Sequence, residues 1–348
     1  MSKHDHLLSQ VPFPWQDAHW RKLDRLRVNN QLAHAYLIAG SAGLGLRFFA
    51  EKFAHLLLCA QPETGRACAA CKQCFLSANN HHPDLLRIRP EGTSRAVKVE
   101  QIREASEFLS MTSHASGPKI VIIEQSHQMN ASAGNALLKT LEEPNPDSYL
   151  LLVTESVSSM MATIRSRCQR LQFEVPRFDE SLEWLQGQLL GNEDGTKLLV
   201  AADNQPLKAL ELASSDAYEV QQRFIANVCD LLTGHSSIRQ CVSQAAKLGE
   251  PVAIGYLLNL STLIVKSAVT GATVTTADDP PVSRLIRALD QAEHCSKVQT
   301  EGLLSFYQSA LDGRQQLASS TNPNPQLIME SLLRQWACLP LGLRTRLR

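Results

Sequence analysis

The pattern of apolar and polar positions changes character once along the chain. From residue 35 to residue 155, short runs of consecutive apolar residues alternate with amphipathic stretches. Consecutive apolar positions are typical of buried parallel strands, whereas a spacing of three to four residues is typical of helices. We expect strands at 35–40, 84–90, 119–124, 148–155 and from 171, and helices over 97–111 and 135–144. This alternation predicts a three-layer α/β domain.

Beyond residue 180 the strand pattern nearly disappears and helical spacing takes over. Short candidate helices are followed by longer ones, and the last begins after an Asn-Pro-rich segment at 321–326. We therefore predict an α/β domain over 1–173, a small helical domain over 174–216 and a larger helical domain over 217–348.

Charge and composition narrow the function classes. The 348 residues include 34 Lys plus Arg and 34 Asp plus Glu, so no global field would draw the chain to nucleic acid. The N-terminal segment lacks the apolar region of a secretion signal, and no run approaches the roughly 18 apolar residues of a membrane span. We expect a cytoplasmic protein that has no membrane segment and does not bind DNA autonomously.

The segment GSAGLGLR, residues 40–47, looks like a phosphate-binding loop without its nucleotide contacts. A working loop, G-x-x-x-x-G-K-[ST], follows a strand and opens a helix, so that backbone N–H groups surround the phosphates. Gly40, Gly43 and Gly45 supply the glycine-rich turn, but Leu46 replaces the lysine that reaches the phosphates and Arg47 replaces the Mg²⁺ ligand. A plain glycine-rich turn between strand and helix is the alternative.

A second degenerate site favours the nucleotide-loop interpretation. The strand at 119–124 ends in Glu124 and Gln125, where a Walker-B strand would carry an acidic pair. The candidate general base is thus an amide, which cannot accept a proton from water at neutral pH. We expect no tightly bound ATP and no intrinsic ATPase activity on this chain.

Four of the nine cysteines are concentrated in the segment 59–74 with the spacing C-x8-C-x2-C-x2-C. Four thiolates at such spacing can surround Zn²⁺ tetrahedrally, and a site closed by four protein ligands serves structure rather than catalysis. Unrelated thiols and a redox C-x-x-C pair are the alternatives. We predict a structural zinc site whose ligands are Cys59, Cys68, Cys71 and Cys74.

The segment TIRSRC places Arg165 and Arg167 just before the last strand of the α/β domain. An arginine can stabilise the charge on a transferring γ-phosphoryl group, and it can do so in a neighbouring subunit's site. Ordinary surface or salt-bridged arginines are the alternative when these residues are taken alone.

The order of these motifs from residue 40 to residue 168 resembles the AAA+ subunits of clamp loaders. The series is GSAGLGLR, the cysteine cluster, NALLKTLEEP, LLLVTES and TIRSRC. The resemblance implies an AAA+ P-loop-type domain with a zinc module at 59–74, a helical lid and an all-α collar that mediates oligomerisation. It matches the four cysteines to the family's zinc ligands, Arg167 to the arginine finger of the Ser-Arg-Cys motif and Thr154 to the sensor-1 residue. Lys208 lies near the sensor-2 region without a clean match.

The ATP-hydrolysing gamma/tau members of this family keep the lysine and the Ser/Thr that residues 46 and 47 lack. The resemblance therefore implies a non-hydrolysing stator of the DNA polymerase III clamp loader, a component of that polymerase holoenzyme. It would belong to a pentamer with delta and gamma/tau, present Arg167 in trans to a gamma/tau site, and help to load the beta clamp on primed DNA. The alternatives are an active gamma/tau-like ATPase that uses Arg47, and a zinc-containing module that binds nucleic acid or protein.

Overall fold

The computed structural model describes residues 3–90, 96–115, 117–189, 193–214, 216–270, 297–318 and 323–339. The chain divides into two compact units, residues 1–210 and residues 211–348. The first unit holds the sheet and the second is helical within its described residues.

Five parallel strands form the sheet of the first unit, in the order β2-β3-β4-β1-β5. Ala35 of β1 pairs with Leu150 of β4, and Ala39 pairs with Thr154. The five strands predicted from the sequence are confirmed. Their bounds are β1 (Ala35–Ala39), β2 (Leu85–Ile88), β3 (Lys119–Ile123), β4 (Ser148–Thr154) and β5 (Gln169–Gln172).

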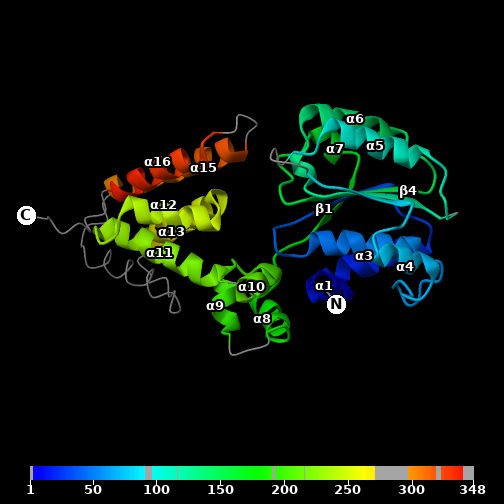
Figure 1. Ribbon diagram of the computed structural model, residues 1–348, viewed down its shortest axis with the longest axis horizontal. Helices are drawn as coiled ribbons and strands as arrows, with labels where there is room; N and C mark the ends of the chain where they lie inside the picture. Colours follow the sequence, from blue (N-terminus) through cyan, green and yellow to red (C-terminus); the bar gives the residue numbers. More distant parts are fainter. Residues whose placement is uncertain are drawn as a thin grey trace, which may run out of the picture. The chain divides into compact units, whose positions relative to one another are not determined.

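The two faces of the sheet carry separate cores because successive strand residues point in opposite directions. Tyr36 and Ile38 belong to the core of one face, whereas Ala35 and Leu37 belong to that of the other. Helix α3 (Leu46–Leu58) covers the first face, and α5 (Val99–Ser110) and α6 (Ala131–Glu142) cover the second (Figure 1). The predicted three-layer α/β domain is thus confirmed.

Shorter elements complete the first unit. Its N-terminal segment contains α1 (Lys3–Ser9), the 3₁₀ turn η1 (Pro14–Gln16) and α2 (Asp17–Val28). Between strands lie α4 (Lys72–Ala78), the 3₁₀ turn η2 (Ser126–Gln128) and α7 (Ala162–Arg165). After the sheet come α8 (Phe178–Gln186), α9 (Gly195–Ala201) and α10 (Pro206–Ala213), which crosses the boundary between the units. A lid domain with the bounds 174–216 stays a prediction.

The second unit packs its helices around one core, which contains the fully buried Trp336. The indole N–H of Trp336 donates to the carbonyl of Val228 at 3.0 Å. Among the described helices, no single one is long and apolar enough to cross a membrane, and two pass that test only as a pair bent by 118°. The helices are α11 (Ala217–Thr233), α12 (Ile238–Leu248), α13 (Glu250–Thr270), α15 (Lys297–Ala318) and α16 (Pro325–Ala337).

Candidate functional site

The glycine-rich loop joins β1 to α3, and its glycines are needed for close packing and turn geometry. Gly43 and Gly45 have φ angles of +75° and +78°, which favour glycine. A Cβ atom on Gly40 would lie 2.8 Å from the carbonyl oxygen of Phe173. Leu46, at the lysine position, is 5% exposed and belongs to the core beneath α3. The guanidinium carbon of Arg47 lies 5.0 Å from the ring centre of Phe48.

The chain itself covers this loop from two sides. Trp15 Nε1 and Gln16 Nε2 both donate to the carbonyl of Leu44, at 2.9 and 2.8 Å. On the other side, the N–H of Leu207 at the start of α10 donates to the carbonyl of Gly43 at 3.1 Å. A Cβ atom on Gly43 would lie 2.9 Å from the Cβ of Gln205 and 3.1 Å from that of Lys208. The N-terminal segment and α10 therefore hold the loop directly.

Three aromatic rings reinforce this cover. Phe13 is fully buried, and its ring would come within 2.6 Å of a Cβ atom on Gly45. Trp15 stacks on Phe13 with ring centres 5.2 Å apart, and Trp184 of α8 meets both rings edge-on at 5.5 and 5.3 Å. Each such pair contributes about 0.5–1.5 kcal/mol beyond area burial. Helix α8 is thereby tied to the N-terminal segment above the loop.

The end of β3 uses its acidic residue for an ion pair within the fold. Glu124 Oε1 accepts a hydrogen bond from Arg89 Nε at 2.7 Å. Gln125 is exposed and has a φ of +49°, and the turn η2 begins directly after it. Thr154, at the end of β4, is buried, and its hydroxyl oxygen accepts the N–H of Ser156 at 3.1 Å. That oxygen also lies 3.3 Å from Nδ1 of His127, whose pKa is lowered by burial.

Arg167 is anchored on the opposite face of the sheet from the loop. Ile164 of α7 belongs to the core of the second face, whereas Leu44 belongs to that of the first. Arg167 Nη2 lies 2.7 Å from Glu142 Oε1, and Nη1 donates to the carbonyl of Thr163 at 3.0 Å. Its side chain is 37% exposed. The fold thus presents Arg167 to solvent and does not bring it to the chain's own loop.

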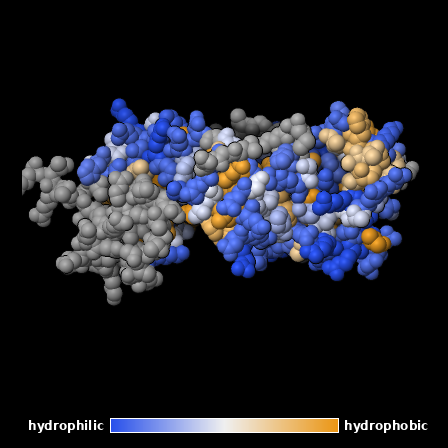
Figure 2. All heavy atoms as spheres, turned by 90° about the horizontal axis from the view of Figure 1, so that it is seen from below, coloured by the Kyte–Doolittle hydropathy of each residue, from blue (hydrophilic) through white to orange (hydrophobic). Residues whose placement is uncertain are grey.

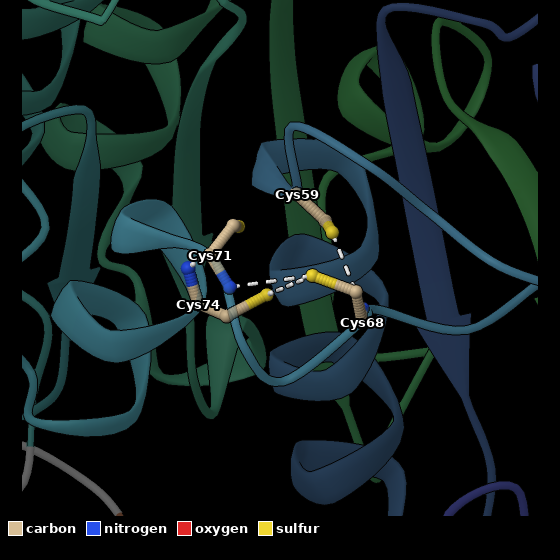
Figure 3. Close-up of side chains that lie close together, drawn as sticks. All are labelled: Cys59, Cys68, Cys71 and Cys74. Carbon is tan, nitrogen blue, oxygen red and sulfur yellow. Dashed lines mark hydrogen bonds between the residues drawn. The ribbon is translucent and has the colours of Figure 1, made fainter.

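The four predicted cysteines come together at the C-terminal end of α3 and the start of α4 (Figure 3). Their sulfur atoms all lie within 4.8 Å of one another, and those of Cys68 and Cys74 are 3.9 Å apart. Four sulfurs at about 2.3 Å from one ion in a tetrahedron lie about 3.8 Å apart. The N–H groups of Cys68, Cys71 and Cys74 donate to Sγ of Cys59, Cys68 and Cys71 at 3.2, 3.4 and 3.4 Å. The cluster could therefore hold a metal ion.

Burial, hydrogen bonds and a nearby lysine set the pKa values of the cluster. The N–H of Cys74 lowers the pKa of Cys71 to about 6, whereas burial raises the pKa values of Cys59 and Cys74. A cation that ligates all four sulfurs would displace the protons of the buried thiols. Burial and the charge of Arg66 lower the pKa of Lys52, and Cys74 opposes them. Lys52 therefore lies where it would offset the negative charge of four thiolates.

The cysteine module has little apolar core of its own. Phe75 of α4 is 69% exposed, and Ala69 and Ala70 are exposed as well. Figure 2 shows a largely hydrophilic surface with separate apolar patches, one of them at the end of the first unit where Figure 1 shows α4. Because so few of its apolar side chains are buried, a metal ion bound by the four cysteines would add to the few contacts that hold this module, such as the hydrogen bond from Trp20 Nε1 to the carbonyl of Gly65 at 3.0 Å.

A buried polar cluster links α3 to β2 close to the cysteines. Arg87 Nη2 donates to Glu51 Oε1 at 3.0 Å and lies 3.4 Å from Nε2 of His55. The side chains of Arg87 and Glu51 are 14% and 5% exposed, and His55 is buried. Burial lowers the pKa of His55 to about 4; Glu51 opposes this shift, and the charge of Arg87 adds to it. His55 is therefore neutral at pH 7.

We expect this cluster to make the first unit less stable in mild acid. The unfolded chain binds a proton at His55 near pH 6.5, whereas the folded chain binds it only near pH 4. The contribution of neutral His55 to the free energy of unfolding is therefore fully present above pH 6.5 and is lost as the pH falls towards 4. This loss amounts to about 2 kcal/mol between pH 7.5 and 5.0. Urea unfolding of the wild type and of His55→Asn measures this, since the variant should show a correspondingly flatter pH profile. His81→Asn, on an exposed loop, should keep the wild-type profile; parallel profiles for all three proteins would contradict the assignment.

Two features of the site were not recognised in the sequence. The first is the packing of Trp15 and Trp184 over the glycine-rich loop, which residues distant in the sequence bring about. The apolar, proline-containing segment VPFPW (residues 11–15) was the available signal for Trp15. Glu142 was noted only as part of the motif LEEP, and no local signal pairs it with Arg167.

Comparison with known proteins gives a consistent set of relatives. A family model described as "DNA polymerase III, delta subunit" matches residues 15–177, and its C-terminal counterpart matches residues 275–337. The "DNA polymerase III subunit delta'" of Pseudomonas aeruginosa is 33% identical over 94% of this chain and 98% of its own length. The Escherichia coli protein of the same name is 28% identical over 92% and 94%.

More distant similarity extends to another subunit and to a solved structure. The "DNA polymerase III subunit tau/gamma" of Haemophilus influenzae is 35% identical over 44% of this chain and 22% of its own length. A solved gamma subunit-related protein from Thermotoga maritima is 19% identical with a TM-score of 0.47, covering 92% of this chain and 99% of its own.

Proposed function

Because the chain belongs to the delta' subunits of the DNA polymerase III clamp loader, we propose that it works in that loader without binding or hydrolysing ATP. In this proposal it acts as a stator and supplies Arg167 to the ATP site of a neighbouring gamma/tau subunit. The partners are gamma/tau and delta in a pentameric loader, and indirectly the beta clamp and primed DNA.

The observation that carries the proposal is the cover over the glycine-rich loop. A nucleotide would need the space around Gly43 and Gly45, where Gln205, Lys208 and Phe13 pack. It would also need a lysine at position 46 to reach its phosphates and a Ser or Thr at position 47 to ligate Mg²⁺. Leu46 cannot make the first contact and Arg47 cannot make the second. The loop is retained because it builds the strand-to-helix turn of the core.

The same cover supports the role of a stator. In an ATPase, a lid that contacts the nucleotide can change position when the nucleotide changes. Here Leu207 of α10 binds the loop directly and Trp184 of α8 packs on Phe13 and Trp15. Because these contacts join α8 and α10 to the loop segment through the protein itself, ATP turnover would not change them in this proposal.

The surroundings of Arg167 support its role in trans. Its guanidinium forms an ion pair with Glu142 and donates one hydrogen bond to the carbonyl of Thr163. At least three of its five N–H groups have no protein partner among the described residues. A planar fork with several outward donors suits the oxygen atoms of a γ-phosphoryl group. An exposed position on a rigid turn after α7 is what a finger for a neighbouring site requires.

The cysteine cluster is proposed to bind one Zn²⁺ ion with a structural role. Zinc prefers sulfur and nitrogen ligands and takes four of them in a tetrahedron. Cys59, Cys68, Cys71 and Cys74 supply four sulfurs at compatible distances, which leaves no open position for a substrate. The chemistry that the ion supplies when bound is therefore cross-linking of the module to the end of α3.

The experiment that tests the nucleotide part compares the wild type with the double variant Leu46→Lys, Arg47→Thr. We expect neither protein alone to bind or hydrolyse ATP at physiological concentration, because the restored side chains would still face an occupied site. Equilibrium binding of a fluorescent ATP analogue with Mg²⁺ and a steady-state phosphate-release assay measure this, with circular dichroism as the folding control. Tight Mg²⁺-dependent binding with turnover by the wild type would instead make the chain a motor in its own right.

A further inference from the structure

We infer that Glu142 is a positioning residue for Arg167, which orients the guanidinium so that its free N–H groups face the neighbouring subunit. This inference rests on the proposed function of Arg167 in trans. It adds a second residue, from a different helix, to what the neighbouring site requires.

The ion pair joins two separate elements. Glu142 is the last residue of α6, and Arg167 lies on the turn after α7. Their closest atoms, Oε1 and Nη2, are 2.7 Å apart and form an ion pair. The second anchor, the carbonyl of Thr163 at 3.0 Å from Nη1, comes from α7 itself. Together the two contacts define both the place and the plane of the guanidinium.

The position of Glu142 in its helix is unfavourable by itself. Unpaired carbonyl groups give the C-terminus of a helix partial negative charge, so an acidic residue in the last turn is repelled. Glu142 occupies that turn, where Lys139 is the basic residue. Removing the charge of Glu142 should therefore not weaken α6. Among the described residues, Glu142 forms an ion pair with Arg167 alone.

Orientation matters because an arginine side chain otherwise has many rotamers. An unrestrained arginine side chain loses this conformational entropy when it binds the phosphate. The loss reduces the stabilisation that the arginine gives to the transition state. Glu142 acts through a carboxylate oxygen that lies beside Nη2, and a glutamine at the same position can place its amide oxygen there. Alanine cannot. This difference separates orientation from a simple effect of charge.

In the opposite role, Glu142 would inhibit the arginine finger by holding Arg167 away from the phosphate. If the carboxylate of Glu142 mainly competed with the phosphate for Arg167, any substitution that removes its charge would free the finger and raise the rate. An exposed ion pair of this kind is weak, because its carboxylate is 51% exposed and water screens it. Such a pair can keep one geometry without preventing a trianionic phosphate chain from approaching.

The test uses loaders assembled from this full chain with gamma/tau and delta, assayed with beta clamp and primed DNA. At saturating ATP, Glu142→Ala should slow hydrolysis of the one ATP per loader that depends on Arg167 by about threefold to tenfold, and the half-saturating ATP concentration should not change. Glu142→Gln should stay within about twofold of the wild type. Glu143→Ala, the exposed neighbouring acid, is the matched control and should have no effect.

A double variant separates this inference from the proposed function. Glu142→Ala combined with Arg167→Ala should be no slower than Arg167→Ala alone, since the positioning residue acts only through the finger. Wild-type or higher rates for Glu142→Ala would overturn the positioning role while leaving the finger in place. Equal losses for Glu142→Ala and Glu142→Gln would also overturn it. An Arg167→Ala loader as fast as the wild type would instead refute the proposed function itself.

Discussion

A loader that carries Arg167→Ala in this chain will lose rapid ATP hydrolysis at one of its sites. An arginine finger raises the rate of γ-phosphoryl transfer about a thousandfold or more. The ATP site that depends on Arg167 should therefore hydrolyse no ATP on the time scale of clamp loading. In the proposed loader, the other ATP sites do not depend on this chain. A rapid-quench experiment with saturating ATP should therefore show a burst that is smaller by one ATP per loader.

Two variants control this result. Arg165→Ala removes a second exposed arginine, at the end of α7, which has no ion pair among the described residues, and should leave the burst unchanged. Arg167→Lys keeps the charge but loses the planar fork, so it should recover only part of the rate. A full burst with Arg167→Ala would remove this residue from the chemistry.

Removing the metal should have the second large effect. We expect about one Zn²⁺ per chain as purified, and loss of the ion after Cys71→Ser or after treatment with a strong chelator. Structural zinc sites contribute on the order of 10 kcal/mol to the folding of small modules, and the module around Phe75 has little other core. The segment 59–74 should therefore become sensitive to proteolysis, and the end of α3 should fray.

Elemental analysis and limited proteolysis followed by mass spectrometry measure this outcome. Cys338→Ser, which removes an exposed cysteine of the second unit, is the matched control and should keep the metal and the protease resistance. Affinity for the ion should weaken in acid, because the ligands must be deprotonated. A metal-free protein with an unchanged cleavage pattern would contradict the structural assignment.

The strands and the cysteine cluster could be predicted because their signals are local. Runs such as KIVII are apolar at consecutive positions, and β3 is buried at every position. The cysteines lie within sixteen residues of sequence, so a spacing rule alone brings them together, and the structure places their sulfurs within 4.8 Å. The same reasoning reached the degenerate loop, where the missing lysine and Mg²⁺ ligand are visible as Leu46 and Arg47.

The contacts over the loop could not be predicted, because they join residues that are distant in sequence. Phe13, Gly45 and Trp184 meet although more than 130 residues separate the last two. Nothing in the sequence near Trp184 distinguishes packing over a loop from packing within a helix pair. Likewise, Glu142 and Arg167 belong to different helices, and their pairing depends on how α6 and α7 pack.

The sequence alone therefore determined the α/β class, the cluster of four cysteines that could hold a metal ion, and the absence of lysine and Ser/Thr at positions 46 and 47 of the loop, since each depends on residue type and on spacing within one segment. Only the tertiary structure decided what covers the loop, which residue holds Arg167 and that His55 lies in a buried polar cluster. The reason is physical. Burial, hydrogen-bond partners and shifts in pKa are properties of the space around a side chain, and that space is filled by distant parts of the chain.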